Sequence, residues 1–191
     1  MAVKRFTFNP KKAALLVIDM QDYFTKPGGH AFIPSSRRII PRIVGLVKAF
    51  NKVGRPVIFT RHIDVNKGNV MNRWWHDSIS RGNPLSRLNK AMPSGLGRVI
   101  VKHEYDAFYK TPLLRLLKKT GTRQVVITGV VAHLCCETTA RSAFCRDLEV
   151  FFAMDGTASY DKRHHKAAMY NLSHGFAVMV KCGEMVKKLS A

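Results

Sequence analysis

Six short apolar runs divide the chain, at residues 13–18, 56–60, 98–101, 124–128, 149–154 and 177–180. The run QVVIT at 124–128 is rich in β-branched residues, as is typical of a strand buried on both faces of a parallel sheet. Helical spacing separates the runs, beginning with a basic amphipathic stretch over 35–53 that Gly54 closes. This alternation predicts an α/β fold with a mainly parallel, six-stranded sheet covered by helices on both faces.

Capping residues mark the expected helix boundaries. Thr111 and Pro112 predict a helix start, with a cap residue followed by proline at the first helical position, and Gly121 predicts its end. Asp161 is placed to cap the last long helix, which extends toward Gly175. A further helix is predicted from Cys135 onward, because small or apolar residues recur there at intervals of three and four.

One long segment, 61–96, breaks the alternation. It contains Trp74, Trp75, glycines and prolines without a clean period. Because ligands bind outside the carboxyl ends of the strands in such sheets, we expect this segment to cover that edge. An equally good interpretation is that the tryptophans anchor a subunit interface.

Length and composition favour one domain over 1–191, since 191 residues with 46% hydrophobic content build one good-sized core. No apolar run is long enough to cross a bilayer, and no secretory segment follows Met1. The four cysteines include no C-x-x-C pair, so reduced thiols in a cytoplasmic protein are expected rather than disulfides or structural zinc.

The net charge of +20 is unusual. Basic pairs are spread along the chain instead of gathering on one element with interleaved aromatics, which argues against a specific nucleic-acid function. We expect a solvated basic surface that attracts anions, and this surface would favour the approach of a small-molecule substrate that is anionic.

Three reactive residues follow apolar runs. Asp19 comes directly after the first run and Lys102 directly after the third, while Cys135 lies just beyond the fourth. In a parallel sheet these residues share one edge. Such residues are often incidental at a rim, and cysteine often only fills space, but together these three combine a base, a cation and a nucleophile.

The three groups have a coherent assignment. At the start of a helix the Cys135 sulfur would face free N–H groups and the positive end of the dipole, which favours a thiolate, and Lys102 would stabilise it further. Asp19 would accept the thiol proton and pass it to the leaving group. Backbone N–H groups of the turn 130–135 are candidates for an oxyanion hole.

The motifs LLVIDMQDYF, VKHEYDAFYKTPLLRLL and ITGVVAHLCCETTARSAFCRDLEVFFAMDGTASYD, in this order, resemble the isochorismatase-like cysteine hydrolases. That family includes isochorismatases, nicotinamidases and carbamoylsarcosine amidases. The resemblance implies a three-layer α/β/α domain of Rossmann-like strand order with the first and fourth strands adjacent. It also implies an Asp19-Lys102-Cys135 triad, a cis peptide between Val130 and Val131 that shapes the oxyanion hole, and a homo-oligomer (dimer or tetramer).

The resemblance extends to two branches of the family. DMQDYF and the Ala-His before the cysteines resemble isochorismatases, which cleave a vinyl ether and release pyruvate. Those enzymes typically carry glycine where this chain has Cys135 and tyrosine where it has Val131. The cysteine favours the amidase branch, whose members attack a carboxamide or carbamoyl group.

Nicotinamidases bring a metal site, but its compact D-x-H spacing is absent from the region that holds His62, Asp64 and His76. We therefore expect neither a metal nor another cofactor. The expected pocket for a small planar substrate consists of Phe24, His62, Trp74, Trp75, Tyr105, Phe108 and His133.

The leading hypothesis is a hydrolase that cleaves the C–N bond of a small amide or carbamoyl compound through a Cys135 thioester. Isochorismatase-type hydrolysis is the first alternative. The second is a catalytically idle domain for binding or assembly, which predicts a closed pocket or a Lys102 side chain turned away from Cys135.

Overall fold

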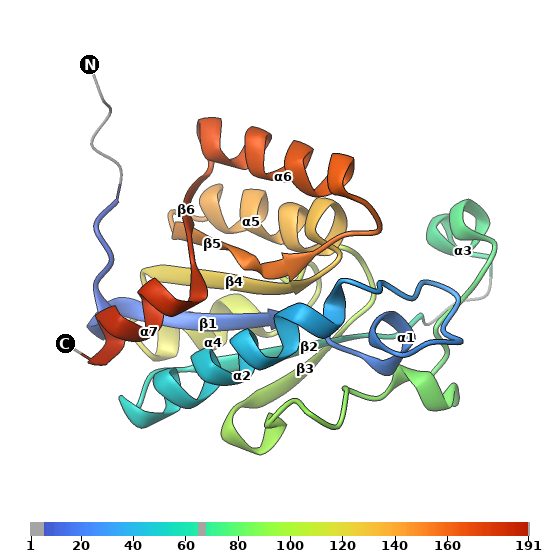
Figure 1. Ribbon diagram of the computed structural model, residues 1–191, viewed down its shortest axis with the longest axis horizontal. Helices are drawn as coiled ribbons and strands as arrows, with labels where there is room; N and C mark the ends of the chain where they lie inside the picture. The colour runs from blue at the N-terminus through green and yellow to red at the C-terminus, as the bar shows by residue number, and fades with distance from the viewer. Residues whose placement is uncertain (1–5, 65–67, 191) are drawn as a thin grey trace.

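The structure, a computed structural model, describes residues 6–64 and 68–190. It contains a six-stranded sheet in the order β3-β2-β1-β4-β5-β6, and all neighbouring strands are parallel (Figure 1). The adjacency of β1 and β4 that the family resemblance implies is present. The strands are β1 (Ala13–Ile18), β2 (Val57–His62), β3 (Arg98–Lys102), β4 (Gln124–Val130), β5 (Glu149–Ala158) and β6 (Ala177–Val180).

The apolar runs locate all six strands, but several strands extend beyond them at the carboxyl end. β2 ends at His62 and β4 at Val130, two residues past each run. β5 continues to Ala158, and its pairing with β4 shifts register between Ile127 and Gly129. These extensions are polar or contain glycine, so hydrophobic patterning could not detect them.

Helices cover both faces of the sheet, which gives the predicted three layers (Figure 1). Residues of α2 and α7 pack on one face, and residues of α4, α5 and α6 pack on the other. The bounds are α1 (Asp22–Thr25), α2 (Ser36–Lys52), α3 (Val70–Trp75), α4 (Leu113–Lys119), α5 (Glu137–Phe144), α6 (Lys162–Gly175) and α7 (Cys182–Ser190).

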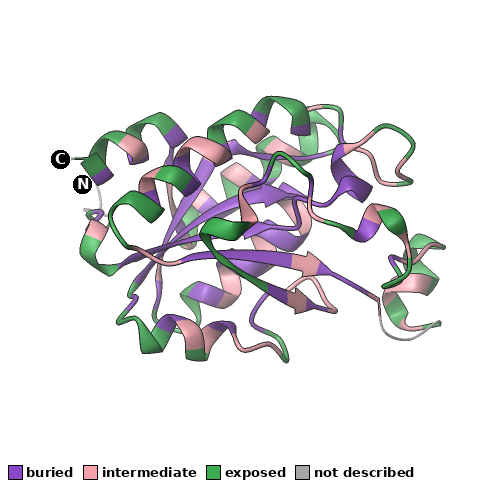
Figure 2. Ribbon diagram, turned by 90° about the horizontal axis from the view of Figure 1, so that it is seen from below, coloured by how far each residue is buried: buried purple, intermediate pink, exposed green. Residues whose placement is uncertain are grey.

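The core lies on the two faces of the central strands. In β1, Leu15 and Val17 belong to the cluster under α2 and α7, whereas Leu16 and Ile18 belong to the opposite cluster. This is the two-residue alternation of a strand, and all of β1 is buried because both faces are covered (Figure 2).

Helix caps agree with the sequence in one case and differ in another. Asp161 caps α6, because its Oδ1 accepts a hydrogen bond from the N–H of His164 at 2.9 Å. In α4, Pro112 is the cap residue itself and the helix begins at Leu113. Thr111 therefore lies one position before the cap and is not the cap residue itself, although its Oγ1 still accepts a hydrogen bond from Leu113 N–H.

The long segment between β2 and β3 contains α3 and two short 3₁₀ turns, Pro84–Ser86 and Ser94–Leu96. It passes over the carboxyl ends of the strands, where several of its residues line a cavity. Among the described helices, none combines the length and apolar character needed to span a bilayer.

Candidate active site

Asp19, Lys102 and Cys135 meet at the carboxyl edge of the sheet, beyond β1, β3 and β4. Lys102 Nζ lies 2.7 Å from Asp19 Oδ2 and 3.4 Å from Cys135 Sγ. β2 stands between β3 and β1, so the Lys102 side chain reaches across the end of β2 to meet the Asp19 carboxylate and the Cys135 sulfur. The sequence places the three residues at one edge, and the length of the lysine side chain brings their reactive atoms together.

Two local features aim the Asp19 carboxylate. Asp19 adopts the left-handed conformation, with φ 47°, directly after β1. Thr60 of β2 holds it from both sides: its Oγ1 accepts from Asp19 N–H at 3.0 Å and donates to Asp19 Oδ1 at 2.6 Å. One carboxylate oxygen is therefore bound by Thr60, and the other faces Lys102.

Gly129 permits the close approach of β4 to the end of β1. Its φ is +109°, and a Cβ placed there would lie 2.0 Å from the carbonyl oxygen of Ile18. Only glycine tolerates both that conformation and that contact. The position of Asp19 beside the turn that carries Cys135 thus depends on a residue without a side chain.

Cys135 lies in a π-helical turn, Ala132–Cys136, that leads into α5. The peptide bond between Val130 and Val131, just before this turn, is cis. The sequence predicted an ordinary helix from Cys135, and the structure differs because the wider turn begins three residues earlier. Single π-helical turns occur frequently at functional sites.

Burial raises the pKa of the Cys135 thiol to about 12; the Lys102 ammonium lowers it and the Asp19 charge raises it further. The side chain is only 5% exposed, so desolvation exceeds the help that the lysine gives. The raised pKa favours the protonated thiol at neutral pH, in contrast to the resting thiolate expected from the sequence.

Lys102 remains charged. Burial works to lower the pKa of Lys102, but the Asp19 carboxylate and the Cys135 sulfur raise it overall. Besides these two partners, its ammonium donates to the carbonyl oxygen of Glu104 at 2.9 Å. All three N–H donors of the fully buried ammonium have a partner, which fixes its position beneath the sulfur.

A cavity of about 280 Å³ opens above Cys135. Its walls are mainly aromatic and aliphatic, and they include two carboxylates but no lysine or arginine among the described residues. The lining side chains that the sequence did not single out are Tyr23, His30, Ala31, Met71, Asp77, Ser78, Ile79, Leu134 and Tyr160. A site with this lining suits a small molecule with a planar apolar part and few polar groups.

Four of the expected pocket residues line this cavity: Phe24, His62, Trp75 and Tyr105. Trp75 donates its indole N–H to the Tyr105 hydroxyl at 2.6 Å, which joins the long segment to the segment after β3. Burial raises the pKa of the Tyr105 hydroxyl, so at neutral pH it is a neutral hydrogen-bonding group.

The structure corrects the pocket at three positions. Trp74 points outward and is 74% exposed, because the short helix α3 directs only its neighbour Trp75 toward the cavity. Phe108 is buried in the core cluster under α4 and α5. His133 faces α6, where its ring stacks on His164 with centroids 4.3 Å apart and its Nδ1 contacts Ser159 Oγ at 3.0 Å.

His62 and Asp64 contribute polar atoms to the cavity. Burial works to raise the pKa of Asp64, but hydrogen bonds from His62 and from Ile79 N–H lower it overall. His62 Nε2 lies 3.3 Å from Asp64 Oδ1, whereas the buried His62 Nδ1 has no hydrogen-bond partner among the described residues.

The same residues do not form a metal centre of the nicotinamidase type. Over residues 6–64 and 68–190, no three His, Cys, Asp or Glu side chains come close enough together to hold an ion. His76, the third candidate metal ligand in the sequence besides His62 and Asp64, does not line the cavity. A structural or catalytic zinc needs at least three protein ligands, so His62 and Asp64 alone do not fit one.

Sequence reasoning missed Thr60, Tyr23 and Asp77. Thr60 is the last residue of the apolar run 56–60, and its side chain contacts Asp19 at the edge of the sheet. A polar residue at the end of such a run could have indicated this contact. Tyr23 bonds to Asp77 across 54 positions of sequence, and neither residue lies in a pattern that could have indicated the pairing.

Comparison with known proteins places this geometry in context. The family model described as Isochorismatase domain matches residues 13–183. Nicotinamidase 3 of Arabidopsis thaliana is 34% identical over 187 residues, covering 95% of this chain and 90% of that protein. Enterobactin synthase component B of Escherichia coli strain K12 is 33% identical over 165 residues, which cover 84% of this chain and 57% of that protein.

Among solved structures, a cysteine hydrolase from Pseudomonas syringae pv. phaseolicola superimposes with a TM-score of 0.91 and 24% sequence identity. The match covers 97% of this chain and 96% of that one. The two chains therefore have the same fold over nearly their whole length.

Proposed function

The chain belongs to the isochorismatase family of hydrolases, and we propose that within this family it is a cysteine amidohydrolase that cleaves the C–N bond of a small amide or carbamoyl compound. The observation that carries the proposal is the arrangement of Cys135 at the floor of the cavity with Lys102 Nζ 3.4 Å from its sulfur. The similarity to a protein named nicotinamidase gives further support.

The proposed reaction starts from a protonated thiol. As Cys135 Sγ bonds to the amide carbon, its proton passes to Asp19, and Lys102 keeps the buried charges balanced. The carbonyl electron pair moves onto oxygen, where N–H groups of the turn after the cis Val130–Val131 bond form the proposed oxyanion hole. Proton transfer coupled to attack explains how a thiol with a raised pKa reacts at neutral pH.

The remaining steps return the enzyme to its starting state. The C–N bond breaks, and Asp19 gives its proton to the leaving nitrogen, which departs as ammonia or an amine. Water then attacks the Cys135 thioester and gives one proton to Asp19, which returns it to the sulfur as the C–S bond breaks. The products are a carboxylic acid and the free thiol.

The cavity favours a neutral group at the reacting end of the substrate, whereas the overall charge predicts the attraction of anionic substrates. Its described lining contains Asp64 and Asp77 but no lysine or arginine, and Lys102 is engaged behind the sulfur. The polar side chains of the lining, among them Ser78 and Asp64, supply polar contacts, and the aromatic walls supply apolar contact area. A planar amide without a formal charge fits this lining best.

The two alternative functions are isochorismatase-type hydrolysis and a catalytically idle domain. Isochorismatase-type hydrolysis draws support from the similarity to Enterobactin synthase component B, yet that chemistry does not use the thiol of Cys135. An idle domain would have a closed pocket or a lysine turned away. Here the cavity is open and Lys102 points at the sulfur, the opposite of both expectations.

The test is ammonia release from a panel of small amides that includes nicotinamide, with Cys135→Ala and Cys135→Gly variants. We expect losses of about 10⁴-fold or more in kcat/KM for both. Cys136→Ala is the matched control, because that buried neighbour does not line the cavity. Full activity of Cys135→Ala would refute the nucleophile, and pyruvate release from isochorismate that survives Cys135→Gly would establish the rival chemistry.

A further inference from the structure

A second concave site adjoins the active-site cavity. It is a groove of about 490 Å³ along the carboxyl-terminal half of β5 and the residues that follow it, between the N-terminal parts of α2 and α6. Tyr160 lines both the groove and the active-site cavity. We propose that this groove, called the α2–α6 groove, binds a small molecule through a phosphate or diphosphate group.

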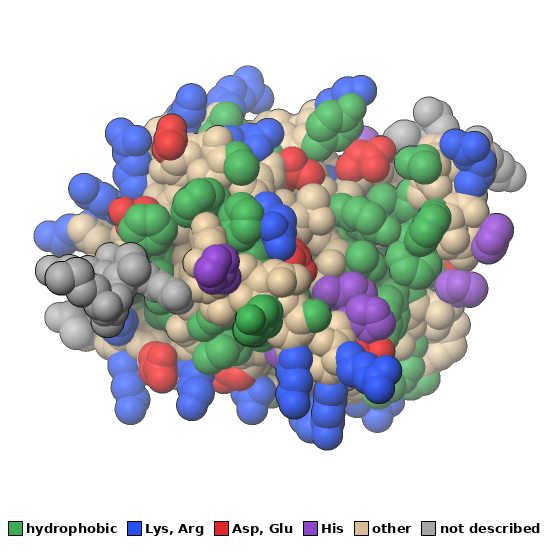
Figure 3. Space-filling model, turned by 90° about the horizontal axis from the view of Figure 1, so that it is seen from above, with side chains coloured by type: hydrophobic (Ala, Val, Ile, Leu, Met, Phe, Trp, Pro, Cys, Tyr) green, Lys and Arg blue, Asp and Glu red, His purple; other side chains and the backbone are tan. Residues whose placement is uncertain are grey.

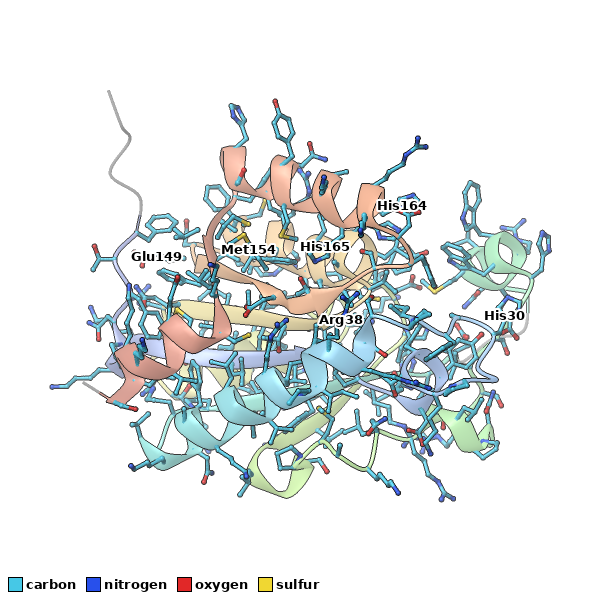
Figure 4. All side chains as sticks on the ribbon, in the orientation of Figure 1. His30, Arg38, Glu149, Met154, His164 and His165 are labelled. Atoms are coloured by element: carbon cyan, nitrogen blue, oxygen red, sulfur yellow. The ribbon has the colours of Figure 1, made fainter. Side chains whose placement is uncertain are left out.

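The charges that line the α2–α6 groove are mostly positive. Its cationic side chains are Arg38, Arg42, Lys162 and Lys166, and its carboxylates are Asp155 and Asp161. Figure 4 shows Arg38 on α2 and His165 on α6 at the two sides of the groove.

Both carboxylates of the groove are already engaged. Asp155 pairs with Arg42, whose Nε lies 3.6 Å from Asp155 Oδ2, and Asp161 caps α6 and contacts His164. In contrast, no carboxylate among the described residues lies within ion-pair distance of Arg38, Lys162 or Lys166. These three side chains leave the groove with an uncompensated positive charge.

The helix termini add to this charge. The groove lies at the N-termini of α2, with 17 residues, and α6, with 14, and neither first turn contains an acidic residue. Instead α2 begins Ser-Arg-Arg and α6 begins Lys-Arg. Cations at the positive end of a helix dipole are unfavourable. At α6 the capping carboxylate of Asp161 offsets them in part, whereas α2 has no such carboxylate, so a bound anion would stabilise the first turn of α2 most.

The hydrogen-bonding groups of the groove suit an oxyanion. Burial lowers the pKa of His165, whose Nε2 lies 3.2 Å from the carbonyl oxygen of Thr157, so the histidine is neutral at pH 7. The positive charge thus comes from lysine and arginine, which stay charged over the physiological range. Arginine recognises phosphate through two parallel hydrogen bonds, and lysine does so as a point charge.

The general basic character of the surface is the competing explanation. Lysine and arginine side chains are spread around the face shown in Figure 3, and any of them attracts anions weakly. The groove differs because its cations surround a concave space and join two helix N-termini. The experiment must therefore separate a site from a diffuse field.

The experiment is isothermal titration of the full chain with inorganic pyrophosphate at about 150 mM ionic strength, where diffuse attraction is screened. The groove variant is Arg38→Gln with Lys166→Gln. The matched control is Lys187→Gln with Lys188→Gln on α7, which removes the same charge from exposed positions outside the groove. Thermal unfolding of both variants checks that they fold.

We expect one saturable site that weakens about 10-fold or more in the groove variant and less than about 2-fold in the control. Equal weakening in both variants would show diffuse attraction and overturn the proposal. So would the absence of saturable binding, as when another copy of the chain covers the groove. Binding is measured without turnover, so Cys135→Ala should keep it even if the proposed hydrolysis fails.

The anionic group can belong to the amide substrate or to a separate molecule. The two sources are distinguished by the effect of pyrophosphate on hydrolysis of the best amide in the panel. Competitive inhibition assigns the anion to the substrate, whose charged part would pass Tyr160 into the groove. Binding of pyrophosphate without competition assigns the anionic group to a separate ligand. Both results support an anion-binding site in the α2–α6 groove.

Discussion

The active-site cavity and the α2–α6 groove share the wall formed by Tyr160 but hold their charges in opposite ways. The cation of the active site, Lys102, is fully buried beneath the sulfur with a partner for each donor. The cations of the groove stand in solvent around a concave surface. A net charge of +20 thus says little about an individual site: the catalytic cavity has no lysine or arginine in its described lining.

The largest expected effect separates the two sites at Asp19. Asp19→Asn should lower kcat/KM for amide hydrolysis about 10³- to 10⁴-fold, because the amide cannot accept the thiol proton. Pyrophosphate affinity in the groove should change by less than about 2-fold, since Asp19 does not line the groove. A parallel loss of affinity would mean that the two sites are one.

Loss of folding must be distinguished from loss of chemistry in that variant. Asp19→Asn leaves the buried Lys102 ammonium without its anion, which costs about 3–5 kcal/mol. The double variant Asp19→Asn/Lys102→Met removes the unpaired charge and should regain most of the thermal stability while remaining inactive. Activity of either variant within about tenfold of the parent protein would contradict the role of Asp19.

A second prediction concerns the protonation of Cys135. With its pKa raised to about 12, its reaction with iodoacetamide at pH 7.5 should be at least about 100-fold slower than that of an ordinary exposed thiol. Cys145, which is exposed, is the internal control, and mass spectrometry reports both sites. The rate at Cys135 should rise with pH as the thiolate fraction grows. Rapid, pH-independent labelling of Cys135 would instead indicate a resting thiolate.

The third prediction concerns the junction beneath the active site. Gly129→Ala places a Cβ 2.0 Å from Ile18 O at a positive φ, so it should destabilise the protein by about 2 kcal/mol or more. The melting temperature should fall by about 4–8 °C, and activity should fall with it as Asp19 moves.

Gly45→Ala is the control for that substitution. Gly45 lies inside α2 with open space around it, and alanine there should stabilise the protein by about 0.5–1 kcal/mol. If both glycine variants changed the melting temperature in the same direction, the close approach at Gly129 would not be the cause.

The smallest expected effect is at the shared wall. Tyr160→Ala should weaken amide hydrolysis and pyrophosphate binding each by about 2- to 10-fold, because one aromatic contact contributes about 0.5–1.5 kcal/mol. Tyr170→Ala, at a residue that is 79% exposed, should change neither. An effect of Tyr160→Ala on one measurement alone would show that only one ligand touches the wall.

The sequence was sufficient for the sheet and for the placement of the reactive residues at its edge. Strands buried on both faces leave continuous apolar runs, and a residue directly after such a run must lie at the strand end, as Asp19 and Lys102 do. The helix cap at Asp161 was visible for a similar reason, because capping is a local interaction.

What the sequence could not give depends on contacts between distant segments. Trp74 and Trp75 are equivalent in pattern, and only the path of α3 directs one outward and the other into the cavity. The thiolate expected at Cys135 rests on the local helix dipole, which does not include the burial of the sulfur, and that burial raises the pKa of the thiol. The α2–α6 groove joins residues more than 100 positions apart, and no short motif connects them.

The reach of Lys102 across β2 also bears on how activity is acquired during folding. The reactive atoms come from positions 19, 102 and 135 on strands whose order in the sheet differs from their order in the chain. Contacts of such high sequence separation form slowly, after the intervening loops have closed. No fragment that lacks the pairing of β1 with both β2 and β4 can assemble the three groups, so enzymatic activity should return only with the final consolidation of the central sheet.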